Sequence, residues 1–192
     1  PGEGAFASSG TNVALGPGGR LWIGTTKGRV LRSSDDGRTW SVVQTPVATG
    51  EATGIFSIAF RDAQHGVVVG GNYQQEQAAD RNVAITTDGG ATWQAATDGR
   101  GLSGYRSVVA WWPGARGGWL AVGPSGSDWS ADEGRTWTEL PAIRHVPGHE
   151  KWTFPPPPHI AHTKSLTFAA NDLNTIYLSV EQGGLLKTTD GG

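Results

Sequence analysis

The stretch SSDDGRTW at residues 33–40 returns twice along this chain. Its copies are TTDGGATW at residues 86–93 and SADEGRTW at residues 130–137, and a shorter copy, TTDGG, occupies residues 188–192. The shared pattern is Ser or Thr, any residue, Asp, any residue, Gly, any residue, Thr and Trp. We refer to each copy as a box. Four copies of one pattern indicate a chain that is built from repeats.

The boxes recur at the interval expected of propeller blades. Their aspartates lie at positions 35, 88, 132 and 190, so neighbouring copies are 53, 44 and 58 residues apart. One four-stranded blade of a β-propeller takes about 40–50 residues. The spacing therefore predicts that each box marks one blade.

The residue types of the box predict a tight hairpin turn. An Asp that opens a turn can accept hydrogen bonds from backbone N–H groups two or three residues further on, and Gly supplies a positive φ. Thr then starts the next strand, and Trp buries a large flat ring against the blade. We assign this structural role to Asp35, Gly37, Trp40, Asp88, Gly90, Trp93, Asp132, Gly134, Trp137, Asp190 and Gly192.

Strand signals surround every box, and no glycine-free stretch of ten residues keeps a helical period. Alternating β-branched and aromatic residues precede the boxes, as at 21–24, 67–70 and 119–123. The prediction is an all-β chain, a β-propeller of four-stranded antiparallel blades with about four blades present. The expected blades and the Pro-rich connector before the last one are, in chain order, residues 10–45, 54–98, 105–140, 141–159 (connector) and 160–192.

The fourth box stops before its Thr and Trp, so the last blade is expected to be unfinished on its own. Either residues 1–9 complete it or the chain continues. Because propellers hold about 4–8 blades, we expect part of a larger ring, with a closed four-blade ring as the alternative. The chain begins at Pro1 and contains no Met, so its true start is also expected to be missing.

Composition excludes several classes of protein. Of the 192 residues, 36% are hydrophobic, which is enough for a sizeable core, and 30 are Gly, which suits many tight turns. The formal net charge of −2 leaves no basic field for a nucleic acid partner. No apolar run reaches the ~20 residues of a membrane span. The absence of Cys removes disulfides, thiolate metal sites and cysteine nucleophiles.

The boxes resemble the Asp-box, or BNR repeat, of sialidases, xyloglucan-active propellers, sortilin-type receptors and photosystem II stability/assembly factors. Longer phrases at residues 1–12, 54–62, 65–71 and 121–128 look like those of exported bacterial propellers of the assembly-factor-like family. This similarity covers residues 1–140, and the sequence after residue 152 resembles a different group of Asp-box proteins. The resemblance implies export to the periplasm or beyond, with no signal peptide in this chain, and a protein partner.

No catalytic constellation emerges from the residues. A sialidase needs an arginine cluster, a Tyr–Glu nucleophile pair and an acid/base Asp, yet the chain has three Tyr and lacks the Arg-Ile-Pro phrase of that family. Other glycosidases need two carboxylates ~5–9.5 Å apart, and no carboxylate outside the boxes forms a telling pair. We therefore assign no catalytic residue, metal or cofactor.

Two clusters invite a ligand and have simpler interpretations. His145, His149, His159 and His162 include spacings found among zinc ligands, but the surrounding prolines favour an extended polyproline-like connector. The surplus of tryptophans suggests a ligand platform, although a core role is favoured. The platform candidates are Trp111, Trp112, Trp119 and Trp129.

Arginines spread over all blades could converge on one face as a patch for anions, although scattered surface positions are the simpler interpretation. These are Arg29, Arg32, Arg61, Arg81, Arg100, Arg106, Arg116 and Arg144.

Two functions remain open at this point. The first is a non-enzymatic exported propeller that binds a protein partner as an interaction or assembly scaffold. The second is a carbohydrate-binding or glycoside-hydrolase propeller. A carboxylate pair in the central funnel would favour the second.

Overall fold

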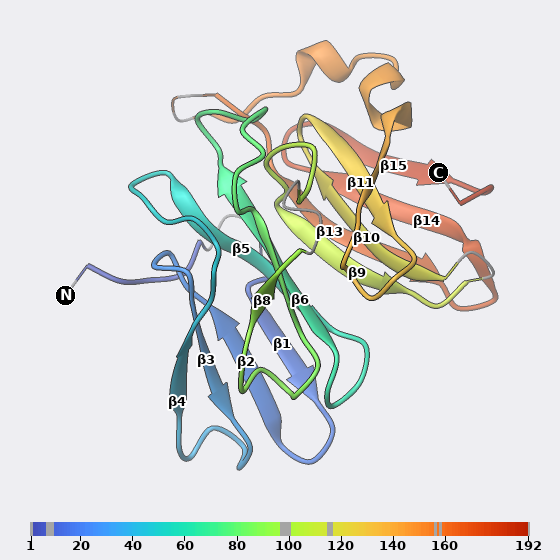
Figure 1. Ribbon diagram of the computed structural model, residues 1–192. Helices are drawn as coiled ribbons and strands as arrows, with labels where there is room; N and C mark the ends of the chain where they lie inside the picture. The colour runs from blue at the N-terminus through green and yellow to red at the C-terminus, as the bar shows by residue number, and fades with distance from the viewer. Residues whose placement is uncertain are drawn as a thin grey trace.

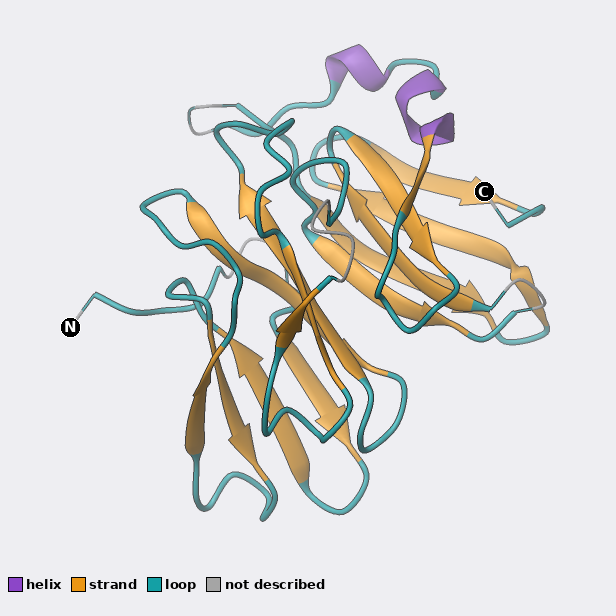
Figure 2. Ribbon diagram, viewed as in Figure 1, coloured by secondary structure: helices purple, strands orange, loops and turns teal. Residues whose placement is uncertain are grey.

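The computed structural model describes residues 2–6, 10–96, 101–114, 117–155, 157 and 159–191. Over these residues the chain is all-β, apart from two short 3-10 helices (Figure 2). The strands form four antiparallel sheets, which we number I to IV in chain order. Sheets I to III have four strands each, and sheet IV has three. In this described part, no helix has the length and apolar character needed to cross a membrane.

Strands pair in chain order within every sheet, as simple meanders. Sheet I contains β1 (Val13–Gly16), β2 (Arg20–Gly24), β3 (Arg29–Ser33) and β4 (Ser41–Gln44). Sheet II contains β5 (Thr53–Phe60), β6 (Gly66–Asn72), β7 (Val83–Thr86) and β8 (Gln94–Ala95). Sheet III contains β9 (Val108–Trp112), β10 (Gly118–Gly123), β11 (Gly126–Ser130) and β12 (Thr138–Leu140). Sheet IV contains β13 (Thr163–Ala169), β14 (Asp172–Val180) and β15 (Gly184–Thr188).

The first strand of each sheet is an inner strand, and the inner strands lie side by side. β5 packs against β1 and β9, and β9 packs against β13 (Figure 1). Among the described residues, β1 and β13 do not pack against each other in this way. The four sheets therefore follow one another around an arc, with sheets I and IV at its ends.

Hydroxyl side chains link the inner strands. Ser57 Oγ accepts a hydrogen bond from the Val109 N–H at 3.0 Å. Ser107 Oγ accepts one from the Thr163 N–H at 3.0 Å and donates to the Thr163 carbonyl at 3.1 Å. Thr11 forms a parallel bridge with Ser57. Short polar side chains thus tie β5 to β9 and β9 to β13, and a backbone bridge joins the residues before β1 to β5.

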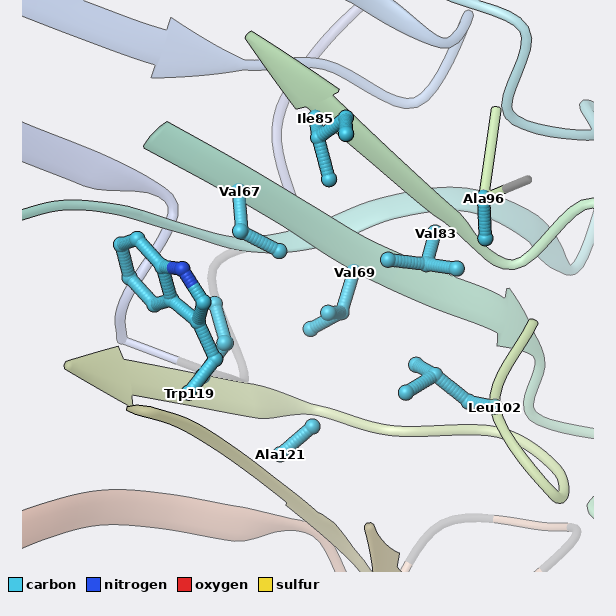
Figure 3. Close-up of a cluster of buried hydrophobic side chains, with 9 residues drawn as sticks. Val67, Val69, Val83, Ile85, Ala96, Leu102, Trp119 and Ala121 are labelled. Carbon is cyan, nitrogen blue, oxygen red and sulfur yellow. The ribbon is translucent and has the colours of Figure 1, made fainter. Parts of the chain in front are cut away.

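Apolar side chains fill the space between successive sheets. The core between sheets II and III contains Val67, Val69, Ile85 and Trp119 (Figure 3). Trp22 lies in the core between sheets I and II, stacked on Phe60 at a centroid distance of 3.7 Å. Trp112 packs between sheets III and IV. The middle strands β6 and β10 are buried on both faces, because apolar side chains pack between successive sheets on either side.

The box turns follow the prediction and add a further residue to it. The backbone of Arg38, three residues on, bonds to the Asp35 carboxylate, and Thr39 N and Oγ1, four residues on, donate to it at 2.9 and 2.6 Å. The first box residue also holds the turn, because Ser33 Oγ accepts a hydrogen bond from the Gly37 N–H at 2.9 Å. Gly37 has a φ of 81°. The boxes at 86 and 130 repeat these bonds.

These hydrogen bonds keep the box carboxylates ionised. Bonds from Thr39 and Ser33 lower the pKa of Asp35 to about 2. Burial would raise the pKa of Asp132, but bonds from Thr136 and Ser130 outweigh it and lower that pKa. In the fourth box Thr188 donates to Asp190, while Gly192 lies outside the described residues.

The first part of the connector, residues 141–151, is not the extended polyproline-like segment that we expected. It contains two 3-10 helices, η1 (Pro141–His145) and η2 (His149–Lys151). Pro141 stands in the first turn of η1, where its missing N–H costs nothing and its fixed φ suits a helical turn. Pro147 lies between the two 3-10 helices and in neither of them.

The described N-terminal residues lie along sheet I and do not complete sheet IV. The Thr26 N–H donates to the Gly4 carbonyl at 2.9 Å, and Glu3 forms an ion pair with Arg29. β15 is consequently the edge strand of sheet IV.

The two ends of the arc present different surfaces. On sheet I, Val13, Leu15 and Val42 are 51%, 76% and 53% exposed, beside Trp40 at 41%. On sheet IV the outward residues, which face away from sheet III, are mostly polar: Ser165 and Ser179 share a hydrogen bond at 2.8 Å, and Lys187 lies 5.8 Å from the Tyr177 ring. Leu185 is the exception, at 68% exposed.

Candidate binding site on the loop face

The sheets have two ends, and most of the irregular chain gathers at one of them. This end, which we call the loop face, holds the segments that lead into the inner strands and the hairpins between second and third strands. The η1 and η2 helices lie there (Figure 1). The box turns lie at the opposite end, because they join third to fourth strands.

Aromatic rings from separate parts of the chain form a pocket on the loop face. Phe6 stacks on Phe56 at 3.8 Å, and Tyr73 stands edge-on to both at 6.4 and 6.1 Å. The pocket has a volume of about 170 Å³. Its lining residues are Phe6, Phe56, Tyr73, Phe154, Pro157, Ile160 and His162.

His162 forms the polar floor of this pocket. Its ring stacks beside Phe56 at 6.4 Å and meets the edge of Phe154 at 5.8 Å. Nδ1 lies 3.3 Å from Glu181 Oε2, and Lys164 Nζ lies 2.7 Å from the other oxygen of that carboxylate. Burial lowers the pKa of His162 despite the attraction of Glu181. Burial therefore favours the neutral form of the ring, and the described lining residues of the pocket include no Lys or Arg.

Two further carboxylates of the loop face, Glu3 and Asp128, are paired with arginines. Glu3 accepts hydrogen bonds from Thr25 Oγ1 at 2.7 Å and from Arg29. Asp128 is buried and accepts from Arg106 Nε at 2.7 Å, with Ser103 donating from its N–H and hydroxyl at 3.1 Å each. Burial lowers the pKa of Arg106, although Asp128 opposes the shift. This pair fixes the loop before β9 against β11.

Glu76 is the carboxylate with a raised pKa on this face. Burial causes the rise, and the positive charges of His149 and Arg106 oppose it. Its backbone carbonyl accepts hydrogen bonds from the Tyr105 N–H at 2.8 Å and from Ser125 Oγ at 3.3 Å. A half-buried carboxyl of this kind can hold a proton closer to neutral pH than an exposed one.

The four tryptophans proposed as a ligand platform do not form one. Trp112 and Trp119 are each 1% exposed and lie in two different cores. Trp111 packs edge-on to Trp119 at 5.3 Å, under the Arg61 guanidinium at 4.9 Å. Trp129 Nε1 donates to the Gly117 carbonyl at 2.8 Å. Neighbouring strand residues point to opposite faces, so Trp111 and Trp112 are divided between the two sides of sheet III, and each side is covered.

The four connector histidines do not converge on a metal. His149 Nε2 bonds to the Pro124 carbonyl at 2.9 Å, His159 Nδ1 bonds to the Phe154 carbonyl at 2.9 Å, and His162 turns to Glu181. Within the described ranges, no three His, Cys, Asp or Glu residues gather as a metal site. The arginines likewise pair separately, with Arg29, Arg106 and Arg144 bound to Glu3, Asp128 and Glu139. Arg100 and Arg116 lie outside the described residues.

Sequence reasoning missed the pocket itself. Phe6, Phe56 and Tyr73 carried no ligand prediction, and His162 was considered only for zinc. A signal was present, because Phe56 stands within the inner strand β5 and Tyr105 stands before the inner strand β9.

The sequence matches no protein-family model and no curated protein. Solved structures share its fold at low identity. The GH74 xyloglucanase from Xanthomonas campestris aligns with a TM-score of 0.60 and 16% identity, over 96% of this chain and 29% of that one. An ancestral GH74 enzyme aligns with a TM-score of 0.59 and 15% identity, over 99% of this chain and 24% of that one. YCF48 from Cyanidioschyzon merolae aligns with a TM-score of 0.50 and 16% identity, over 93% of this chain and 53% of that one.

These neighbours are propeller proteins, and the four sheets superpose on their blades. The chain folds as part of a β-propeller. Sheets I to IV are its blades, and the chain spans about a quarter of the GH74 enzymes and half of YCF48. The loop face is one end of the propeller, where the aromatic pocket lies beside the inner strands. At such low identity, the neighbours establish the fold of these blades and not their activity.

Proposed function

We propose that this chain belongs to an exported Asp-box propeller, similar to the photosystem II stability/assembly factors, that binds an extended protein segment on its loop face without catalysing a reaction. The aromatic pocket carries the proposal. Rings of this kind bury large apolar side chains and act as hot spots in protein interfaces. The neutral His162 and the paired Glu181 allow an uncharged side chain to enter without desolvating a free charge.

The state of the carboxylates supports binding over catalysis. Glu3, Asp128 and Glu181 each hold a cation, and a glycosidase needs one carboxylate free to attack or to activate water. The fold that the chain shares with YCF48 also supports the binding proposal.

Peptide selection tests this proposal. A random peptide library displayed on phage is selected on the purified chain, and the dissociation constants of enriched peptides are measured by fluorescence anisotropy. Tyr73→Ala and Phe154→Ala should weaken binding at least about tenfold, the equivalent of 1.4 kcal/mol. Tyr177→Ala, on the outward face of sheet IV, is the matched control and should leave binding unchanged. Enriched peptides that bind all four proteins equally would contradict a role for the pocket.

The alternative is a glycoside hydrolase, and Glu76 favours it. A carboxyl whose pKa burial raises suits a general acid, and the GH74 neighbours share the fold. Release of reducing ends from xyloglucan, lost in Glu76→Gln and retained in Glu139→Gln, would establish this function and overturn the binding proposal. We expect no release of reducing ends from the parent chain or from either variant.

A further inference from the structure

His162 has one ring nitrogen that the surrounding protein does not use. Its Nδ1 lies 3.3 Å from Glu181 Oε2, whereas Nε2 has no hydrogen-bond partner among the residues that the structure describes. The ring is only 6% exposed, and it lines the aromatic pocket of the loop face. A polar atom that is withdrawn from water without a partner costs free energy. A ligand that supplies the missing partner therefore gains affinity.

The carboxylate of Glu181 determines which nitrogen of the ring carries the proton. An ionised carboxylate only accepts hydrogen bonds, so a neutral imidazole bonds to it through an N–H at Nδ1. Burial favours the neutral form, because it lowers the pKa of His162. In that tautomer Nε2 carries a lone pair and no proton. The pocket thus contains a hydrogen-bond acceptor of fixed position.

The other lining residues do not impose a polarity on the ligand. They are Phe6, Phe56, Tyr73, Phe154, Pro157 and Ile160. Of their side chains only Tyr73 has a polar atom, a hydroxyl that rotates to donate or to accept a hydrogen bond. The choice of polar group on the ligand is therefore made by His162.

The size and the walls of the pocket suit one aromatic ring. An apolar cavity of about 150 Å³ holds a benzene molecule, and this pocket has a volume of about 170 Å³. The rings of Phe56 and Phe154 lie 6.4 and 5.8 Å from the His162 ring, one parallel to it and one edge-on. A single ring with one small substituent fits this space.

We propose that the pocket selects the phenol of a tyrosine over the ring of a phenylalanine, with the phenol hydroxyl donating a hydrogen bond to His162 Nε2. This inference rests on the proposed function, in which the loop face binds an extended protein segment, and it names the side chain that the segment inserts. A site that bonds a hydroxyl discriminates against the analogue without it, because the buried acceptor then stays unpaired.

Analogues of the two side chains test the inference without a peptide. p-Cresol carries the phenol of tyrosine, and toluene carries the ring of phenylalanine. NMR titration of the 192-residue chain at pH 7.5 measures both dissociation constants, and p-cresol should bind at least about fivefold more tightly. In a long-range proton–nitrogen correlation spectrum, p-cresol should move the Nε2 resonance of His162 toward that of a protonated nitrogen. Toluene should leave that resonance in place.

Two histidine variants assign the preference to one residue. His162→Phe removes the acceptor and keeps a ring, so it should erase the preference for p-cresol while toluene still binds. His65→Phe is the matched control, because His65 Nδ1 also pairs with a carboxylate, that of Asp62 at 2.9 Å, but does not line the pocket. It should keep the parent preference. Far-UV circular dichroism verifies that both variants fold, and the Nε2 resonance of the parent chain tests the inference independently of them.

Equal binding of the two probes to the parent chain, or a preference that persists in His162→Phe, would overturn the inference and leave the pocket standing as an apolar hot spot. Binding of neither probe would overturn it too, and would also remove the pocket from the proposed function. A preference for p-cresol together with a failed peptide selection would contradict the proposed function alone.

Discussion

Ser130 is almost fully buried, and its Oγ accepts the Gly134 N–H at 2.9 Å while donating to Asp132 at 2.9 Å. Ser130→Ala leaves that N–H buried without a partner and should cost about 1–3 kcal/mol. Thr holds the same box position at 86, so Ser130→Thr should stay within about 0.5 kcal/mol of the parent. Urea unfolding measures both variants. Equal midpoints for the Ala and Thr variants would show that the hydroxyl has no such role.

Gly90 combines a φ of 81° with a close neighbour, since a Cβ there would lie 3.1 Å from Trp22 Nε1. Gly90→Ala should therefore lose about 1–3 kcal/mol, from backbone strain and from displacement of the buried indole. Gly184 has a φ of 94° with open space around its Cβ position, so Gly184→Ala reports the strain alone, about 1 kcal/mol. Thermal unfolding compares the two, and an equal loss would exclude the steric contribution of Trp22.

His162 should make stability depend on pH. Its folded pKa lies below its ordinary value of 6.5 because burial disfavours the cation, while Glu181 and Lys164 act in opposite directions on it. The contribution of His162 to the free energy of unfolding is fully present above pH 6.5. It decreases as the pH drops below that value, because the unfolded chain takes up the proton first. His162→Phe should lose this part of the dependence. Urea midpoints from pH 7.5 to 5.5 test it, and parallel curves for the two proteins would refute the assignment.

The buried ion pair between Arg106 and Asp128 holds the loop before β9 against β11. Removing one partner of such a pair strands the other charge and typically costs about 3–5 kcal/mol. We expect Arg106→Met to lose that amount, and Arg106→Met with Asp128→Leu to lose clearly less than the sum of the single variants. A double-mutant cycle in urea measures the coupling, and additive losses would mean that the two groups act independently.

The strands could be predicted because their signals are local. Period two in residues such as 67–70 and the recurring box both act within a few positions. The loop-face pocket could not be predicted, because Phe6, Phe56 and His162 belong to three blades and meet only after the sheets have packed around the arc. The core role that we favoured for the tryptophans holds for Trp112 and Trp119. Which core each ring enters could not be predicted, because it depends on how the sheets pack.

The whole molecule has one end of its arc apolar and the other polar. Val13, Leu15 and Val42 expose their side chains on the outward face of sheet I. Such a patch favours association. Leu15→Lys with Val42→Thr should reduce concentration-dependent self-association, measured by sedimentation velocity, whereas Ser179→Lys on sheet IV should not. Unchanged association in the double variant would exclude the sheet I face as its cause.

The hydroxyl row along the inner strands also sets how separation of the blades can be observed. The amide protons of Val109 and Thr163 are held by Ser57 and Ser107 of the preceding blade, not by a partner strand of their own sheet. Their exchange with deuterated solvent requires one blade to part from its neighbour, even while each sheet stays intact. Exchange at these two amides thus reports the opening between blades. Exchange at amides within the strand ladders reports the fraying of strands instead.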